Sequence, residues 1–157
     1  MTTIMDRTVP VAEDLTTEEH RLQVLRGLEK AHRVDKPYAT GETFEMGEWA
    51  VLNADGKCER ASATPAVCYL VFSGTDRWDS KATGQVTIFM ATQLIVKTTK
   101  YDASATYAVN DLLTVKDLGA SESHVTRHTA GEVAVAKVVE VGTDYLVYET
   151  MSPVAIG

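Results

Sequence analysis

Long apolar runs and clustered basic residues are both missing from this chain of 157 residues. No uninterrupted apolar stretch approaches the ~20 residues that span a bilayer, and the amino terminus has no basic start followed by an apolar core. We therefore expect no membrane segment and no secretory leader, in a protein made and kept in solution in a cytoplasm. The net charge of -7 argues against nucleic acid as a partner, because affinity for phosphates comes from clustered Lys and Arg.

Cysteine is also scarce. The two cysteines, Cys58 and Cys68, are too few for a disulfide framework. They flank a predicted turn at residues 62–65, so an antiparallel hairpin would bring them near one another and the geometry would allow a bridge. We expect two reduced, half-buried thiols, as is usual in a reducing compartment.

The side-chain patterns of catalytic and metal sites are missing as well. His124 and His128 are four residues apart, but no third ligand accompanies them, and their surroundings favour strand or loop over helix. There is no G-x-S-x-G motif and no glycine-rich phosphate loop. The sequence thus predicts a protein that is not an enzyme, with no catalytic residues, no metal and no cofactor.

The first 40 residues are predicted to form an amino-terminal arm. Thr16 and Glu19 have the spacing of a capping box, which indicates the start of a helix. An apolar stripe at helical spacing follows, formed by Leu22, Leu25 and Leu28. The arm should therefore consist of an extended segment and one short α-helix over about residues 16–32. Because one narrow stripe cannot hold a helix alone, the helix must dock on the β domain, on a sister subunit or on a different protein.

Residues 41–157 carry short β signals separated by turn residues, which predicts a mainly β domain. Asp55-Gly56 between two extended runs indicates a hairpin, because the turns that match strand twist need positive φ. Two further hairpins are predicted, one joining residues 86–90 to 94–98 and the other joining 133–141 to 145–150. Such a density of strands favours a small antiparallel β-barrel or sandwich.

Two polar stretches, residues 73–84 and 117–131, are predicted to be loops. Long loops in compact domains are commonly binding elements or disordered segments. Trp78 lies on the first of them, where a large aromatic side chain serves either as a contact anchor or as a lid over an open end of the domain.

The β domain contains a series of short segments: Gly47-Glu48-Trp49-Ala50-Val51, Asp55-Gly56-Lys57, Thr83-Gly84-Gln85-Val86-Thr87, Lys97-Thr98-Thr99-Lys100-Tyr101-Asp102, Tyr107 to Val115 and Gly131 to Val138. In their order and residues these segments resemble the head decoration, or capsid cement, proteins of tailed bacteriophages. The likeness covers roughly residues 41–153. The chain departs from the family pattern at Asn110, where Gly is expected before Asp, and at Ala91-Thr92, which replace a glycine-rich turn.

The resemblance implies a small β-barrel behind a variable amino-terminal segment, and a virion protein of the outer capsid surface. Such proteins bind the major capsid protein, commonly as homotrimers at threefold and quasi-threefold positions, and stabilise the DNA-filled head. With the arm and the first loop as contact elements, we expect capsid or subunit contacts from Leu22, Leu25, Leu28 and Trp78. Two other functions stay open: another phage structural role, in a tail or fibre, and a small-molecule-binding β-barrel enzyme.

Overall fold

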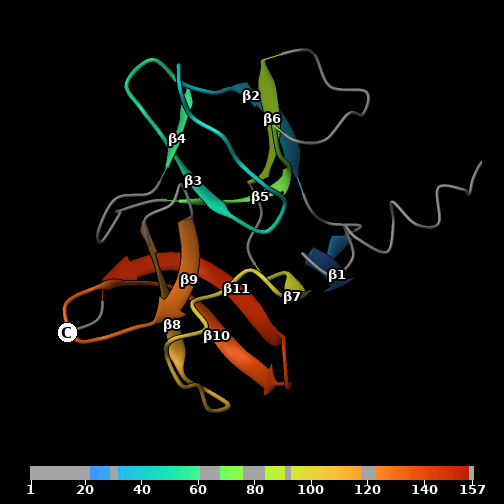
Figure 1. Cartoon of the computed structure of the whole chain (residues 1–157), viewed down its shortest axis with the longest axis vertical. Helices are drawn as coiled ribbons and strands as arrows, with labels where there is room; N and C mark the ends of the chain where they lie inside the picture. Colours follow the sequence, from blue (N-terminus) through green and yellow to red (C-terminus); the bar gives the residue numbers. More distant parts are fainter. Residues whose placement is uncertain are drawn as a thin grey trace, which may run out of the picture.

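The computed structural model describes residues 22–28, 32–60, 68–75, 84–90, 93–117 and 123–155. Two antiparallel sheets make up this part of the chain, one drawn above the other in Figure 1. The six-stranded sheet has the order β1 (Leu22–Arg26), β7 (Ile95–Thr98), β11 (Leu146–Ala155), β10 (Val133–Val141), β8 (Leu112–Asp117) and β9 (Ser123–Arg127). The five-stranded sheet has the order β2 (Arg33–Pro37), β6 (Gln85–Phe89), β5 (Tyr69–Ser73), β3 (Trp49–Leu52) and β4 (Cys58–Arg60). The predicted mainly β fold is confirmed, as a sandwich-like pair of sheets rather than a closed barrel.

The predicted helix over residues 16–32 is wrong where the structure describes it. Residues 22–26 form β1, which pairs antiparallel with β7 in a register that places Leu22 opposite Thr98 and Val24 opposite Val96. Leu22 and Val24 face the core with the two-residue period of a strand. Tertiary pairing overrides the leucine spacing, because a short helix gains little on its own. The start of the predicted helix lies outside the described residues.

Both described strands of the predicted arm pair with the rest of the chain. β1 pairs with β7, and β2 pairs with β6 over all five of its residues. The sequence left three docking partners open for the arm. In the structure, Leu22 of the arm packs into the protein's own β core. That residues 41–153 fold without residues 1–37, as the sequence indicates, stays a prediction.

Two of the three predicted hairpins are confirmed. β3 and β4 flank Asp55-Gly56, with Gly56 at φ 75°, and β10 pairs with β11. The hairpin between residues 86–90 and 94–98 is wrong, because β6 and β7 belong to different sheets. The chain crosses over through Gln93, which has a φ of 66° and donates a 3.0 Å backbone hydrogen bond to Thr150 of β11.

The predicted loop at residues 117–131 is also wrong in part, because residues 123–127 form β9. β9 pairs with β8 in a continuous register from Leu113–Arg127 to Asp117–Ser123. Its Ser, His, Thr and Arg side chains hide the strand signal, yet Ser123, His124 and Thr126 are all buried.

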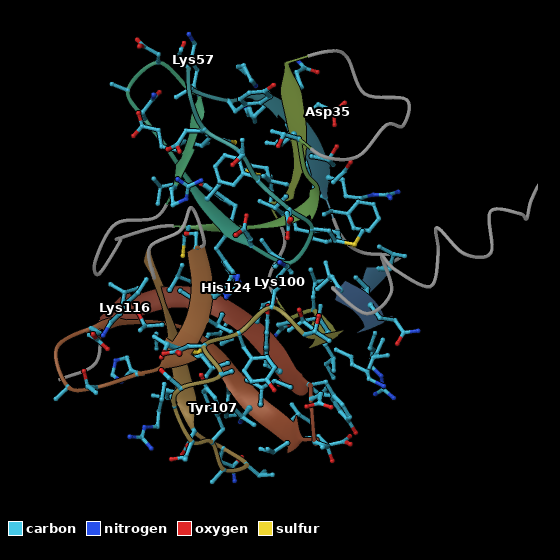
Figure 2. All side chains as sticks on the ribbon, viewed as in Figure 1. Asp35, Lys57, Lys100, Tyr107, Lys116 and His124 are labelled. Carbon is cyan, nitrogen blue, oxygen red and sulfur yellow. The ribbon has the colours of Figure 1, made fainter. Side chains whose placement is uncertain are left out.

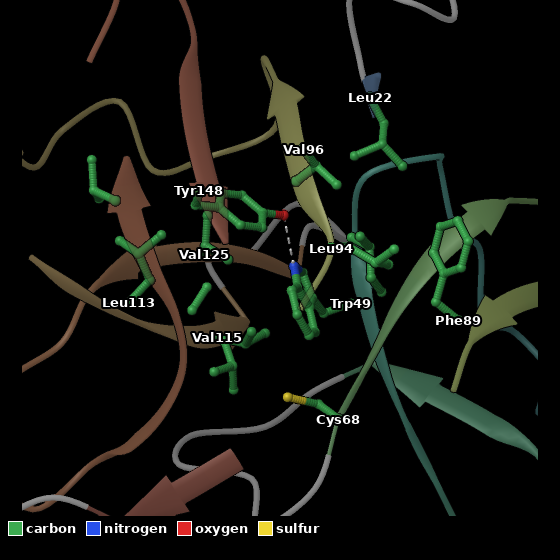
Figure 3. Packing of buried hydrophobic residues seen from close by; sticks show 14 of the residues in the cluster. Leu22, Trp49, Cys68, Phe89, Leu94, Val96, Leu113, Val115, Val125 and Tyr148 are labelled. Carbon is green, nitrogen blue, oxygen red and sulfur yellow. Dashed lines mark hydrogen bonds between the residues drawn. The ribbon is translucent and has the colours of Figure 1, made fainter. Parts of the chain in front are cut away.

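Apolar side chains gather in two clusters. The larger one combines residues of both sheets, including Trp49, Leu70 and Phe89 from the five-stranded sheet and Val96, Leu113 and Tyr148 from the six-stranded sheet (Figure 3). The smaller one lies within the five-stranded sheet and consists of Phe44, Ala50, Cys58, Val71, Val86 and Ile88. The shared larger cluster is therefore what holds the two sheets together.

Candidate functional site

The predicted contact leucines separate in the structure. Leu22 is a core residue, only 4% exposed, whereas Leu25 is 50% exposed and Leu28 is 41% exposed. The register of β1 against β7 shifts between Val24 and Arg26, so Leu25 is the extra residue of a β-bulge. Leu25 lies on the outer face of β1, opposite the face that buries Leu22 and Val24. Trp78 lies outside the described residues.

Gly27 fixes the end of β1 between the two exposed leucines. It has a φ of 98°, and an added Cβ would lie 3.1 Å from the carbonyl oxygen of Gln93 and 3.2 Å from a methyl carbon of Leu94. Glycine is thus favoured here both by the left-handed backbone and by the close approach of the residues before β7. We define Leu25, Gly27 and Leu28 as the β1 contact segment.

The outer strands of both sheets carry features that oppose strand addition. The β1 edge has its bulge, and β2 carries Arg33, Asp35 and Pro37. Tyr38 forms an isolated parallel β-bridge with Cys58 on the outer strand β4. Tyr101 forms one with Val125 on the outer strand β9. Contacts of this part of the chain with a partner are therefore expected through side chains rather than through backbone pairing.

A buried polar cluster lies where the turn before β3 meets β9. Glu48 and His124 are 2% and 6% exposed, and Figure 2 shows His124 and Lys100 at the level where the two sheets meet. The Glu48 carboxylate accepts hydrogen bonds from the amides of Glu45, at 2.8 Å, and of Ser123, at 3.3 Å. His124 Nε2 lies 3.7 Å from Glu48 Oε2, and Lys100 forms an ion pair with Glu45. We call Glu45, Glu48, Lys100 and His124 the junction cluster.

Next to the junction cluster, Asp102 links the segment before β8 to β9 through hydrogen bonds. Its carboxylate accepts hydrogen bonds from the Ser104 hydroxyl at 2.6 Å, the Ser104 amide at 3.0 Å and the Thr126 hydroxyl at 2.8 Å. Although partial burial works against the charged form, these hydrogen bonds hold the pKa of Asp102 below its usual value. The segment is thereby kept over the edge of β9.

The two histidines singled out by their spacing have separate surroundings. His124 faces Glu48, whereas the Nε2 atom of His128 lies 2.7 Å from the carbonyl oxygen of Glu132. Within the described ranges, no group of three or more His, Cys, Asp or Glu side chains is arranged to hold a metal ion.

Both cysteines are free, but they are buried and not half-buried as expected, and they belong to different apolar clusters. Burial raises the pKa of Cys58 to about 11 and that of Cys68 to about 12. Both thiols are therefore protonated at neutral pH and are weak nucleophiles.

Sequence reasoning missed Glu48 and Asp102 as structural anchors. The Asp102-Ala103-Ser104 stretch has the spacing of an Asx turn, which is a local signal that could have been found. The role of Glu48 between the sheets leaves no local signal, because Ser123, its hydrogen-bond partner on the other sheet, is 75 residues away.

Comparison with protein-family models, with curated proteins and with solved structures finds no match to this chain. In the part of the chain that the structure describes, no helix has the length and apolar character needed to cross a membrane.

Proposed function

We propose that this chain is a capsid decoration protein of a tailed bacteriophage. It binds the major capsid protein on the outer surface of the shell as a homotrimer and stabilises the DNA-filled head. The observation that carries the proposal is the exposure of Leu25 and Leu28 around the bulge of an edge strand, in a segment the sequence singled out for contact. The sandwich-like β fold and the positive φ of 79° at Asn110, where the family pattern has Gly, also support it.

The two leucines can supply a useful share of the binding free energy. Complete burial of a leucine contributes about 1.5–3 kcal/mol, so covering the exposed half of each contributes about 1 kcal/mol. Two leucines then contribute about 2 kcal/mol per subunit, which corresponds to roughly thirtyfold in affinity. In a trimer the three copies act together, so modest contacts add up to firm attachment.

The test is co-sedimentation of the full chain with heads that lack the protein. We expect saturable binding, and a Leu25→Ser, Leu28→Ser double variant should need at least about thirtyfold more protein for half-saturation. Val109→Ser is the matched control, because Val109 is an aliphatic residue of similar exposure, 56%, in the turn before β8. The control should bind like the unchanged chain.

Four results would contradict parts of the proposal. Absence of binding to heads at any concentration, or labelling of tails instead of heads, would exclude the decoration function. Equal binding by the double variant and the control would remove the β1 contact segment from the interface. Sedimentation velocity of the free protein tests the trimer, and a monomer at all concentrations would contradict it.

A further inference from the structure

The charges of the junction cluster do not balance while the Glu48 carboxylate is ionised and the imidazole is neutral. Lys100 is paired with Glu45, and the neighbouring Asp102 is satisfied by Ser104 and Thr126. Glu48 then carries a negative charge that is shielded from solvent and held mainly by two amide hydrogen bonds. One added proton makes the Glu48 and His124 pair neutral overall, either as carboxylate with imidazolium or as carboxylic acid with imidazole.

The position of this pair couples its charge to the contact between the sheets. The backbone of Glu48 binds β5, because its carbonyl oxygen accepts the Val71 amide at 2.8 Å. The side chain reaches across to Ser123 and His124 of β9 in the other sheet. An unfavourable charge on Glu48 therefore directly weakens the contact between the two sheets.

We propose that Glu48 and His124 form a proton-dependent link between the two sheets, in which uptake of one proton tightens the contact of the turn before β3 with β9. The ionisable groups facing the pair are Glu45 from the same turn and Lys100 and Asp102 from the segment before β8. This link is independent of the proposed attachment to capsids.

The direction of the effect follows from the linkage between proton binding and folding. Burial raises the pKa of Glu48 above its ordinary value of 4.5, outweighing the hydrogen bonds from Glu45 and Ser123 and the charge of Lys100. The folded protein thus binds this proton more tightly than the unfolded chain does. The stability that Glu48 contributes is complete below pH 4.5 and is lost as the pH rises through the folded-state pKa.

Urea unfolding of the full chain between pH 4.5 and pH 8 tests the link. For one proton, the unfolding equilibrium constant should increase with pH by up to about tenfold per pH unit. A Glu48→Gln variant keeps the shape of the side chain but cannot titrate, so its profile should be flatter. His128→Gln is the matched control, because it removes a histidine next to the same strand outside the junction cluster, and it should keep the original slope. A Glu48→Gln variant with the unchanged slope would overturn the proposal.

A measurement without substitution covers the case in which Glu48→Gln fails to fold. The amide proton of Ser123 donates to the Glu48 carboxylate, so its NMR chemical shift reports the charge of that group. We expect the shift of this amide to titrate between pH 4.5 and pH 8. A Ser123 amide shift that stays constant across this range would overturn the proposal.

Discussion

The indole Nε1–H of Trp49 donates a 3.3 Å hydrogen bond to the hydroxyl of Tyr148 inside the apolar cluster that both sheets share (Figure 3). The two residues are 99 positions apart, in β3 and β11, and their ring centroids are separated by 6.4 Å. Complete burial raises the pKa of Tyr148 well above the ordinary value of a tyrosine. The pair joins the two sheets within an otherwise apolar cluster.

Removing the Tyr148 hydroxyl should destabilise the protein. A Tyr148→Phe variant leaves the buried indole N–H of Trp49 without this acceptor, which we expect to lower the free energy of unfolding by about 1–3 kcal/mol. Urea denaturation followed by circular dichroism measures the change. Tyr145→Phe is the control, because the Tyr145 hydroxyl donates to Glu140 at the surface, and its unfolding midpoint should stay the same. Equal midpoints for the two variants would show that the buried hydrogen bond contributes nothing.

The two leucines of β1 should differ sharply in their effect on stability. Leu22→Ala removes a side chain from the shared cluster and should cost about 2–5 kcal/mol, because it leaves a cavity. Leu25→Ala changes the exposed residue of the bulge and should stay within about 0.5 kcal/mol of the unchanged protein. Thermal or urea unfolding of both variants measures the difference. Comparable losses would mean that Leu22 and Leu25 do not lie on opposite faces of β1.

Local turn chemistry explains what could be predicted of this fold. Asp55-Gly56 and the short connection between β10 and β11 specify their hairpins within a few residues, so sequence reading placed both. The connection between β6 and β7 is also short, but its course depends on Thr150 of β11. The backbone and side chain of Thr150 form hydrogen bonds with Gln93 and Leu94. Such a partner, more than 50 residues away, leaves no mark in the local pattern.

The surface could be predicted only in part for a similar reason. The sequence marked the leucines of the arm for contact, but helical spacing places all three on one face. The two-residue period of β1 instead puts Leu22 and Leu25 on opposite faces. The junction cluster escaped prediction because Glu48 and His124 meet only after both sheets have formed. β9 was hidden by polar side chains whose partners, such as Asp102 for Thr126, also come from outside the strand.

Asn110 should respond in opposite directions to two small replacements. It has a φ of 79°, its amide donates to the Val138 carbonyl at 2.9 Å, and the Val138 amide donates to the Asp111 carbonyl at 2.8 Å. This is the arrangement of a G1 bulge, in which the first residue favours glycine. Asn110→Gly should leave the free energy of unfolding equal or raise it by up to about 1 kcal/mol, whereas Asn110→Ala should lower it by about 1 kcal/mol. Urea unfolding of both variants checks the order, and a less stable Gly variant would contradict it.

Asp102 should account for part of the loss of stability in acid. Because its pKa is lowered in the folded state, the stability it contributes is present above the ordinary value of 3.8 and is lost as the pH falls through the folded-state pKa. Asp102→Asn cannot accept the Ser104 and Thr126 hydrogen bonds in the same way, so it should lower the free energy of unfolding at pH 7 by about 1 kcal/mol.

The difference between Asp102→Asn and the unchanged protein should shrink as the pH falls from 5 to 3, because Asp102 takes up its proton at a higher pH in the unfolded chain than in the folded protein. Unfolding at each pH measures this difference, and Asp144→Asn, an exposed carboxylate in the β10–β11 turn, is the charge-matched control. A gap that stays constant down to pH 3 would show that Asp102 acts by shape rather than by charge. A gap that closes would place the carboxylate at the centre of the contact between the segment before β8 and the edge of β9, since Thr126 is its partner on that strand.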